Sequence, residues 1–129
     1  MNDNRFTFVR IPRERGSATR VEVRIGDGAA NPYLATAAAL AAGLDGIRRE
    51  LEPPAPLAGL IYELPEAEKM TPLPRSFEAA LEALDADDLI KEAMGEELVA
   101  TFLEIKNFEL DRSHRYVTDW EWREYTHHL

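Results

Sequence analysis

The sequence predicts an α+β fold in which a small antiparallel sheet packs against helices and a helical C-terminal tail follows. Two short segments near the N-terminus, residues 6–11 and 20–25, are rich in β-forming side chains. From residue 32 onward, apolar side chains recur at helical spacing instead. With 129 residues, of which 45% are apolar, the chain is long enough to bury a core as one domain.

The two predicted strands are separated by a polar loop. The first, residues 6–11, stops at Pro12, and residues 13–19 contain Gly16 and read as a connection. The second, residues 20–25, alternates strictly and ends at the Asp27-Gly28 turn. One face carries Val21, Val23 and Ile25, and the other carries Arg20, Glu22 and Arg24.

An alanine-rich helix is expected next. Asn31 is a good N-cap and Pro32 a good first helical residue. The apolar positions that follow at helical spacing are Leu40, Leu44, Ile47 and Leu51. Residues 53–75 then hold six of the eight prolines, which predicts a long connection with one short strand at residues 60–62.

The last third of the sequence predicts helices. Ser76 caps a short one, Asp87 or Asp88 starts a short turn that ends at Gly95, and a longer helix runs from about residue 96 to about residue 116. Its apolar residues fall on two neighbouring strips, Leu98, Phe102 and Ile105 on one and Val99, Leu103 and Leu110 on the other. The capping box at residues 118–121 predicts a final helix.

Charge is distributed unevenly along the chain. Residues 1–24 carry six arginines against three acids, whereas the remainder carries nine basic against twenty-one acidic residues, for a net charge of −9. An acidic protein repels nucleic acid, and a small arginine-rich patch suits a compact anion such as a phosphate or carboxylate. There is no cysteine and no apolar run of membrane-spanning length. We therefore expect a cytoplasmic protein with neither nucleic acid nor membrane among its partners.

The Arg20-x-Glu22-x-Arg24 pattern admits two interpretations. Alternating charges on one strand face can simply keep a solvated surface free of repulsion. Alternatively, a carboxylate can hold Mg²⁺ while flanking guanidinium groups hold phosphate oxygens. Arg5 and Arg10 would add fixed charges, but they fall on opposite faces of a regular strand. Both can serve one site only if Arg5 precedes the strand or a bulge intervenes.

Four linked motifs resemble the glutamine synthetase family. Their order and spacing match the C-terminal part of that family's catalytic domain, and the tail from residue 73 to residue 121 is similar to family members. The motifs are Asn4-Arg5-x4-Arg10-Ile11-Pro12, Arg20-Val21-Glu22-Val23-Arg24, Ala29-Ala30-Asn31-Pro32-Tyr33-Leu34 and Ala41-Ala42-Gly43-Leu44-Asp45-Gly46-Ile47. The resemblance implies that the sheet is part of the family's catalytic barrel, and that residues 1–129 form the C-terminal portion of the domain.

The family joins glutamate to ammonia or another amine at the expense of ATP, with Mg²⁺ or Mn²⁺ at the site. The resemblance implies that Glu22 ligates the metal nearer the nucleotide phosphates and that Arg10 and Arg20 bind nucleotide phosphate oxygens. It further implies that Arg5 contacts the transferred phosphoryl group, and that Arg24 acts at the glutamate substrate and the phosphoryl group that it receives. The parent enzyme is expected to be a homo-oligomer.

The family's other metal ligands have no counterpart in this sequence, nor do its N-terminal domain and the first part of its catalytic domain. His114, His127 and His128 do not match its metal-binding histidine and are interpreted as surface residues. One carboxylate cannot hold two Mg²⁺ ions, so the chain alone is expected to be inactive.

The identity of the amine is left open. Residues 25–28 read Ile-Gly-Asp-Gly, where many ammonia-using members have a Phe-x-Asp-Pro run. This departure and residues 117–121 are more similar to the branch that makes γ-glutamyl amides from polyamines or methylamine. Two other hypotheses are a non-catalytic module that associates with intact synthetase subunits and a small-molecule sensor.

Overall fold

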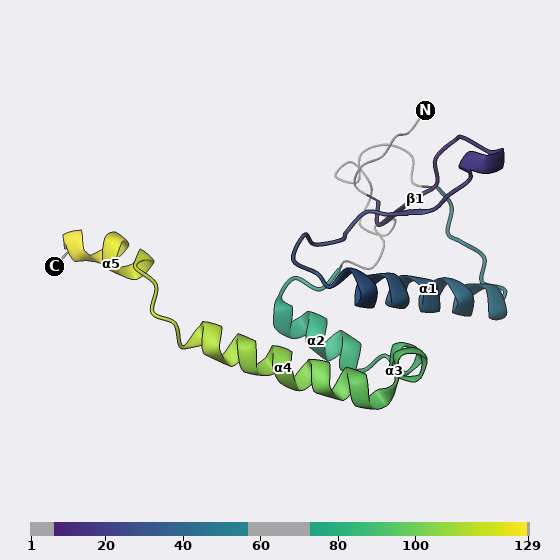
Figure 1. The fold of residues 1–129 in the computed structure, drawn as a ribbon. Coiled ribbons are helices and arrows are strands. Elements are labelled where there is room, and N and C mark those ends of the chain that lie inside the picture. The colour runs from purple at the N-terminus through teal and green to yellow at the C-terminus, as the bar shows by residue number, and fades with distance from the viewer. Residues whose placement is uncertain (1–6, 57–72, 129) are drawn as a thin grey trace. The chain divides into compact units, whose positions relative to one another are not determined.

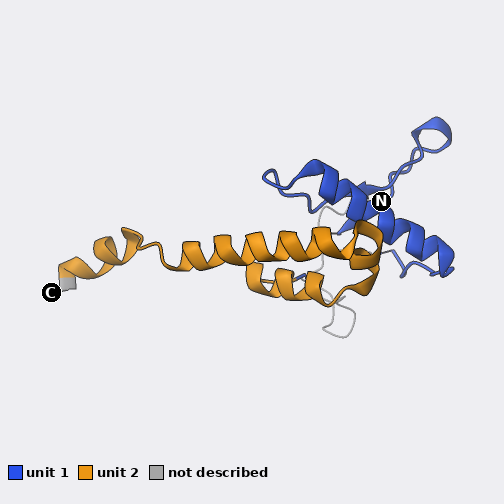
Figure 2. Cartoon of the chain, turned by 60° about the horizontal axis from the view of Figure 1, so that its bottom comes forward, with its two compact units in different colours: residues 1–73 blue, residues 74–129 orange. Residues whose placement is uncertain are grey.

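A computed structural model of the chain describes residues 7–56 and 73–128. The chain divides into two compact units, residues 1–73 and residues 74–129 (Figure 2). Among the described residues, the first unit contains a two-stranded antiparallel sheet and one long helix, and the second contains helices (Figure 1). The predicted α+β class is therefore confirmed. The strand predicted at residues 60–62 lies outside the described residues.

The sheet of the first unit is shorter than the sequence pattern suggests. Strands β1 (Val9–Arg10) and β2 (Glu22–Val23) pair with Val9 opposite Val23 and Arg10 opposite Glu22. A further backbone hydrogen bond, from the Arg24 amide to the Phe8 carbonyl at 2.9 Å, continues the ladder by one step. Among the described residues the strand pair has no third partner, and Pro12 follows two residues after β1, so few positions are left for regular pairing.

A tight turn lets the chain reverse between the two strands. The 3-10 helix η1 (Gly16–Ala18) is closed by a hydrogen bond from the Thr19 amide to the Gly16 carbonyl at 3.1 Å. Gly16 has a φ of +70°, a conformation that glycine adopts without the steric cost of a Cβ atom. The sequence prediction of a connecting loop at residues 13–19 is borne out in this form.

Helix α1 (Pro32–Arg48) begins as predicted. The Asn31 side chain accepts hydrogen bonds from the amides of Tyr33 and Leu34 at 2.9 and 3.3 Å, and proline occupies the first helical position. None of its residues is buried. The apolar side chains Leu40, Leu44 and Ile47 are 63%, 51% and 75% exposed, so the part of the chain that the structure describes does not cover this stripe.

The second unit is a small helical cluster. Helix α2 (Phe77–Asp85) is capped by the Ser76 hydroxyl, and α3 (Asp88–Met94) is capped by the Asp87 carboxylate. Gly95, with a φ of +95°, ends α3 and begins the long helix α4 (Glu96–His114). These boundaries match the predicted ones to within two residues.

The core of this unit forms where α2, α3 and α4 contact one another. Leu81 of α2 and Val99 of α4 are the buried apolar side chains of the described residues. On α4 the strip containing Val99, Leu103 and Leu110 is the better covered one, because Leu98 and Ile105 of the other strip are exposed. The sequence identified both strips, and the contacts with α2 and α3 decide between them.

The tail forms helix α5 (Trp120–Tyr125) and the short 3-10 helix η4 (Thr126–His128). The predicted capping box is present in altered form. The Thr118 hydroxyl accepts a hydrogen bond from the Trp120 amide at 3.3 Å and donates one to the Glu121 carboxylate at 2.7 Å. The Glu121 carboxylate thus accepts a hydrogen bond from the Thr118 side chain. This hydrogen bond is the main reason that the pKa of Glu121 is lowered.

Candidate functional site: an arginine–glutamate cluster on the strand pair

The candidate site is built on the register of the two strands. Because Arg10 lies directly opposite Glu22, their side chains project from the same face of the sheet. The Arg10 Nη1 atom donates a hydrogen bond to Glu22 Oε2 at 3.0 Å. Two chain segments twelve residues apart in sequence are thereby joined by an ion pair as well as by backbone hydrogen bonds.

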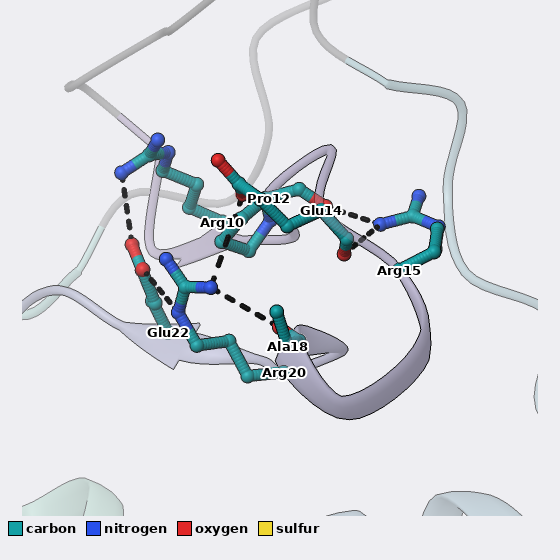
Figure 3. A network of polar contacts seen from close by, with 7 residues as sticks. All are labelled: Arg10, Pro12, Glu14, Arg15, Ala18, Arg20 and Glu22. Atoms are coloured by element: carbon teal, nitrogen blue, oxygen red, sulfur yellow. Dashed lines mark hydrogen bonds and ion pairs between the residues drawn. The ribbon is translucent and has the colours of Figure 1, made fainter.

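A second arginine completes the cluster from within the second strand segment. The Nε atom of Arg20 donates to Glu22 Oε1 at 2.9 Å, and its Nη1 atom donates to the Ala18 carbonyl at 3.1 Å. Figure 3 shows the guanidinium groups of Arg10 and Arg20 directed toward the carboxylate between them. The alternation of residues 20–25 predicted that Arg20 and Glu22 would share a face, and their contact agrees with this.

The cluster lies at the surface but is partly sheltered. The side chains of Glu22, Arg10 and Arg20 are 28%, 31% and 47% exposed. Solvent therefore reaches the group, yet screens the charges less than it would for fully exposed side chains. Guanidinium groups that are held in place in this way suit the binding of a compact anion.

The loop between the strands supplies contacts that the sequence did not predict. Glu14 Oε2 lies 3.8 Å from Arg20 Nη1, with the glutamate side chain 63% exposed. Arg15 donates hydrogen bonds to the carbonyls of Pro12 and Glu14, which ties the loop to itself. Glu14 is the single acidic residue of residues 13–19. That feature of the sequence could have indicated an ion pair with a nearby arginine.

The two remaining predicted site residues are Arg24 and Arg5. The Arg24 backbone amide bonds to Phe8, but its side chain is exposed and makes no ion pair with the part of the chain that the structure describes. Arg5 lies outside the described residues. The structure therefore brings together Arg10, Arg20 and Glu22, and the assignments of Arg5 and Arg24 to the same site stay predictions.

The donor set can be tested for its fit to a metal. Within residues 7–56 and 73–128 no group of three or more histidine, aspartate or glutamate side chains gathers in a way that could hold an ion. Both Glu22 oxygens accept guanidinium hydrogen bonds. A carboxylate is the right ligand type for Mg²⁺, but Glu22 fits such a site only as one ligand among others supplied from elsewhere.

His114 and His127 are surface residues of the second unit. His114, 61% exposed, lies 3.0 Å from Glu78 in the second unit, and His127 is exposed, in agreement with their interpretation as surface residues. The side chain of His128 lies outside the described residues. No helix among the described residues is long and apolar enough to cross a membrane.

Comparison with known proteins shows the family of this chain. Residues 1–125 match the model of the glutamine synthetase catalytic domain. The chain is 42% identical over 128 residues to a glutamine synthetase of Methanococcus maripaludis, covering 96% of this chain and 29% of the relative. It is 43% identical over 126 residues to that of Thermotoga maritima (95% and 29%) and 44% identical over 122 residues to that of Thermus thermophilus (92% and 27%).

The chain thus spans less than a third of the length of these relatives. The match nevertheless covers the strand pair, the arginine–glutamate cluster and all described helices except the end of the tail. The chain belongs to the glutamine synthetase catalytic-domain family.

Proposed function

We propose that this chain supplies one wall of the active site of an ATP-dependent glutamate–amine ligase of the glutamine synthetase type. The observation that carries the proposal is the cluster in which Arg10 and Arg20 flank Glu22, on a chain that belongs to this family. Phosphoryl transfer depends mainly on positioning and on neutralising phosphate charge, and fixed guanidinium groups do both.

Each residue of the wall has a role that suits its chemistry. Arg10 and Arg20 bind nucleotide phosphate oxygens, since their planar donor groups match phosphate geometry. Glu22 provides one oxygen ligand to the Mg²⁺ or Mn²⁺ that accompanies ATP. When bound, such an ion neutralises and orients the phosphates.

Two further arginines are assigned to the reacting end of the substrates. Arg5 contacts the transferred phosphoryl group, and Arg24 binds the glutamate substrate and the phosphoryl group that it receives. The exposed Arg24 side chain, which is not engaged by any described residue, is available for this role. The family resemblance supports both assignments.

Residues 1–129 correspond in this proposal to the C-terminal portion of the catalytic domain. The remaining metal ligands, the rest of the nucleotide site and the N-terminal domain come from polypeptide outside these residues, in a cytoplasmic homo-oligomer. The amine is ammonia or a larger amine, and the Ile25-Gly26-Asp27-Gly28 segment favours the larger-amine branch. The chain alone is inactive, because it provides a single metal-ligating carboxylate.

A second candidate is a non-catalytic module that associates with intact synthetase subunits. The exposed aromatic side chains of the tail favour it, with Trp120, Trp122 and Tyr125 being 58%, 71% and 56% exposed. Such rings on an uncovered helix are typical of protein contacts. A module of this kind would need neither the cluster charges nor the arginine geometry for its function.

A chimaera separates the two candidates. Residues 1–125 would replace the matching segment of the Thermotoga maritima glutamine synthetase, to which the chain is 43% identical. We expect the chimaera to make γ-glutamyl amides from glutamate, ATP and ammonia or methylamine in the presence of Mg²⁺. The isolated chain should show no such activity. A chimaera that assembles to the parent's size but forms no amide would contradict the ligase proposal, as would Mg²⁺-dependent synthesis by the isolated chain.

A further inference from the structure

The Glu22 carboxylate accepts hydrogen bonds from both arginines of the cluster at once. Its Oε2 atom accepts from Arg10 Nη1 at 3.0 Å and its Oε1 atom accepts from Arg20 Nε at 2.9 Å. The two oxygens therefore bridge two cations that come from different strand segments (Figure 3). Each bond joins a charged donor to a charged acceptor, the strongest class of protein hydrogen bond.

The same donor atoms would face an incoming phosphate. Arg20 Nε donates to Glu22 and Arg20 Nη1 donates to the Ala18 carbonyl. The edge of the guanidinium group that carries these two atoms therefore already makes hydrogen bonds within the chain. A polyphosphate that binds along this edge must compete with the carboxylate for the guanidinium hydrogen atoms. A polyphosphate carries several negative charges and Glu22 carries one, so we expect the polyphosphate to displace the carboxylate from the guanidinium groups.

We infer that Glu22 is an internal counter-ion of the arginine pair and that polyphosphate binding displaces it. Displacement frees both carboxylate oxygens at the moment when the phosphates arrive. In the chain without bound polyphosphate, Glu22 pairs with Arg10 and Arg20. Once the two arginines bind an anion, the Glu22 carboxylate becomes available as an oxygen ligand. The inference rests on the proposed function and extends it by giving the cluster a state before binding.

Glu14 offers a matched control. It carries the same charge near the same guanidinium group, but it lies 3.8 Å from Arg20 Nη1 and its side chain is 63% exposed. A looser and more solvated contact contributes little to holding the arginine. Glu14→Gln and Glu22→Gln therefore change the charge of the chain equally, and only the second removes the bridging carboxylate.

The test uses inorganic tripolyphosphate and the full 129-residue chain without metal. Calorimetric titration should show that Glu22→Gln binds tripolyphosphate about tenfold more tightly than the wild type, the factor expected when a charge-assisted competitor of modest strength is removed. Glu14→Gln should tighten binding by less than about threefold. Equal effects of the two substitutions, or no binding by any form of the chain, would overturn the inference.

A second measurement needs no variant and so does not depend on whether Glu22→Gln folds. In the wild type, the Nε–H resonance of Arg20 should shift as tripolyphosphate saturates the chain, because its partner changes from carboxylate to phosphate. An unchanged resonance at saturation would show that the hydrogen bond from Arg20 Nε to Glu22 persists, and it would also overturn the inference. An active chimaera with an undisplaced Glu22 would leave the ligase proposal standing, so the two failures are distinguishable.

Discussion

At the scale of single residues, short-range contacts explain which charges matter. Glu22 is important because two guanidinium groups from different segments converge on it, whereas Arg24, two residues further on, makes no ion pair within the described residues. The alternation of the second strand segment places Arg20, Glu22 and Arg24 on one face. It does not determine that Arg10 lies opposite Glu22, because register depends on the turn at residues 13–19.

Glu78 is one residue of the second unit whose pKa is lowered in the folded state. Hydrogen bonds from its own backbone amide and from the Ser76 hydroxyl, together with His114 at 3.0 Å, hold the pKa of Glu78 below its ordinary value of 4.5. A carboxyl group with a depressed pKa in the folded state stabilises the fold above its unfolded pKa. That contribution is lost as the pH falls through the lower, folded value.

We therefore predict that part of the acid sensitivity of this unit comes from Glu78. As the pH falls from neutrality through and below the ordinary Glu78 pKa of 4.5, the wild type should lose stability, and Glu78→Gln should lose less because it has no proton to take up there. The urea midpoint followed by circular dichroism across this range is the measurement. Glu82→Gln, on the same helix, serves as the control and should retain the wild-type loss. Parallel curves for wild type and Glu78→Gln would contradict the assignment.

At the scale of elements, local signals predict helix ends better than strand lengths. Asn31, Ser76, Asp87 and Gly95 act at the positions that the sequence indicated, because a cap depends on a few neighbouring backbone groups. Strands depend on partners that are distant in sequence. The β-rich segments at residues 6–11 and 20–25 therefore yield regular pairing at only two residues each within the described chain.

The cap of α1 permits a direct test. Replacing Asn31 by alanine removes the acceptor that serves the amides of Tyr33 and Leu34, and should lower the free energy of unfolding by about 1 kcal/mol. Asn31→Asp keeps an acceptor in place and adds a charge that the helix N-terminus favours, so it should be at least as stable as the wild type. Urea unfolding monitored at 222 nm would measure both. An alanine variant as stable as the wild type would show that the cap contributes nothing.

At the scale of the whole molecule, the chain exposes surfaces that proteins usually cover. The strand pair has no further partner among the described residues, and Val21, Val23 and Ile25 are 63%, 49% and 47% exposed. The α1 stripe is uncovered as well. Exposed apolar surface of this kind is typical of a protein contact, and it agrees with the proposal that further polypeptide packs here.

We predict that the isolated chain associates with itself through its strand edges. Unpaired amide and carbonyl groups on an apolar edge invite pairing with another copy. Size-exclusion chromatography with light scattering should show dimers or larger species. Val21→Lys should reduce them, whereas Val117→Lys, at a position 88% exposed in the second unit, should not. A clean monomer at high concentration would contradict the prediction.

The central claim is that Glu22 belongs to a catalytic site and is more than part of a surface ion-pair set. As surface ion pairs its contacts contribute about 0–1 kcal/mol, and its loss would hardly affect rate. As a ligand beside the phosphates it supplies a full charge, and losing comparable electrostatic groups costs about a hundred- to a thousandfold in rate. The two interpretations thus differ by orders of magnitude in one kinetic parameter.

Steady-state kinetics of the chimaera across a Mg²⁺ titration measure that parameter directly. We predict that the Glu22→Gln chimaera assembles normally, requires more Mg²⁺ and loses at least about a hundredfold in kcat/KM for ATP, while Glu14→Gln stays within about threefold of the wild-type chimaera. If kcat/KM of the Glu22→Gln chimaera also stays within about threefold of the wild-type value at saturating Mg²⁺, the catalytic role is contradicted. Glu22 would then be a surface ion-pair residue on a solvated strand face.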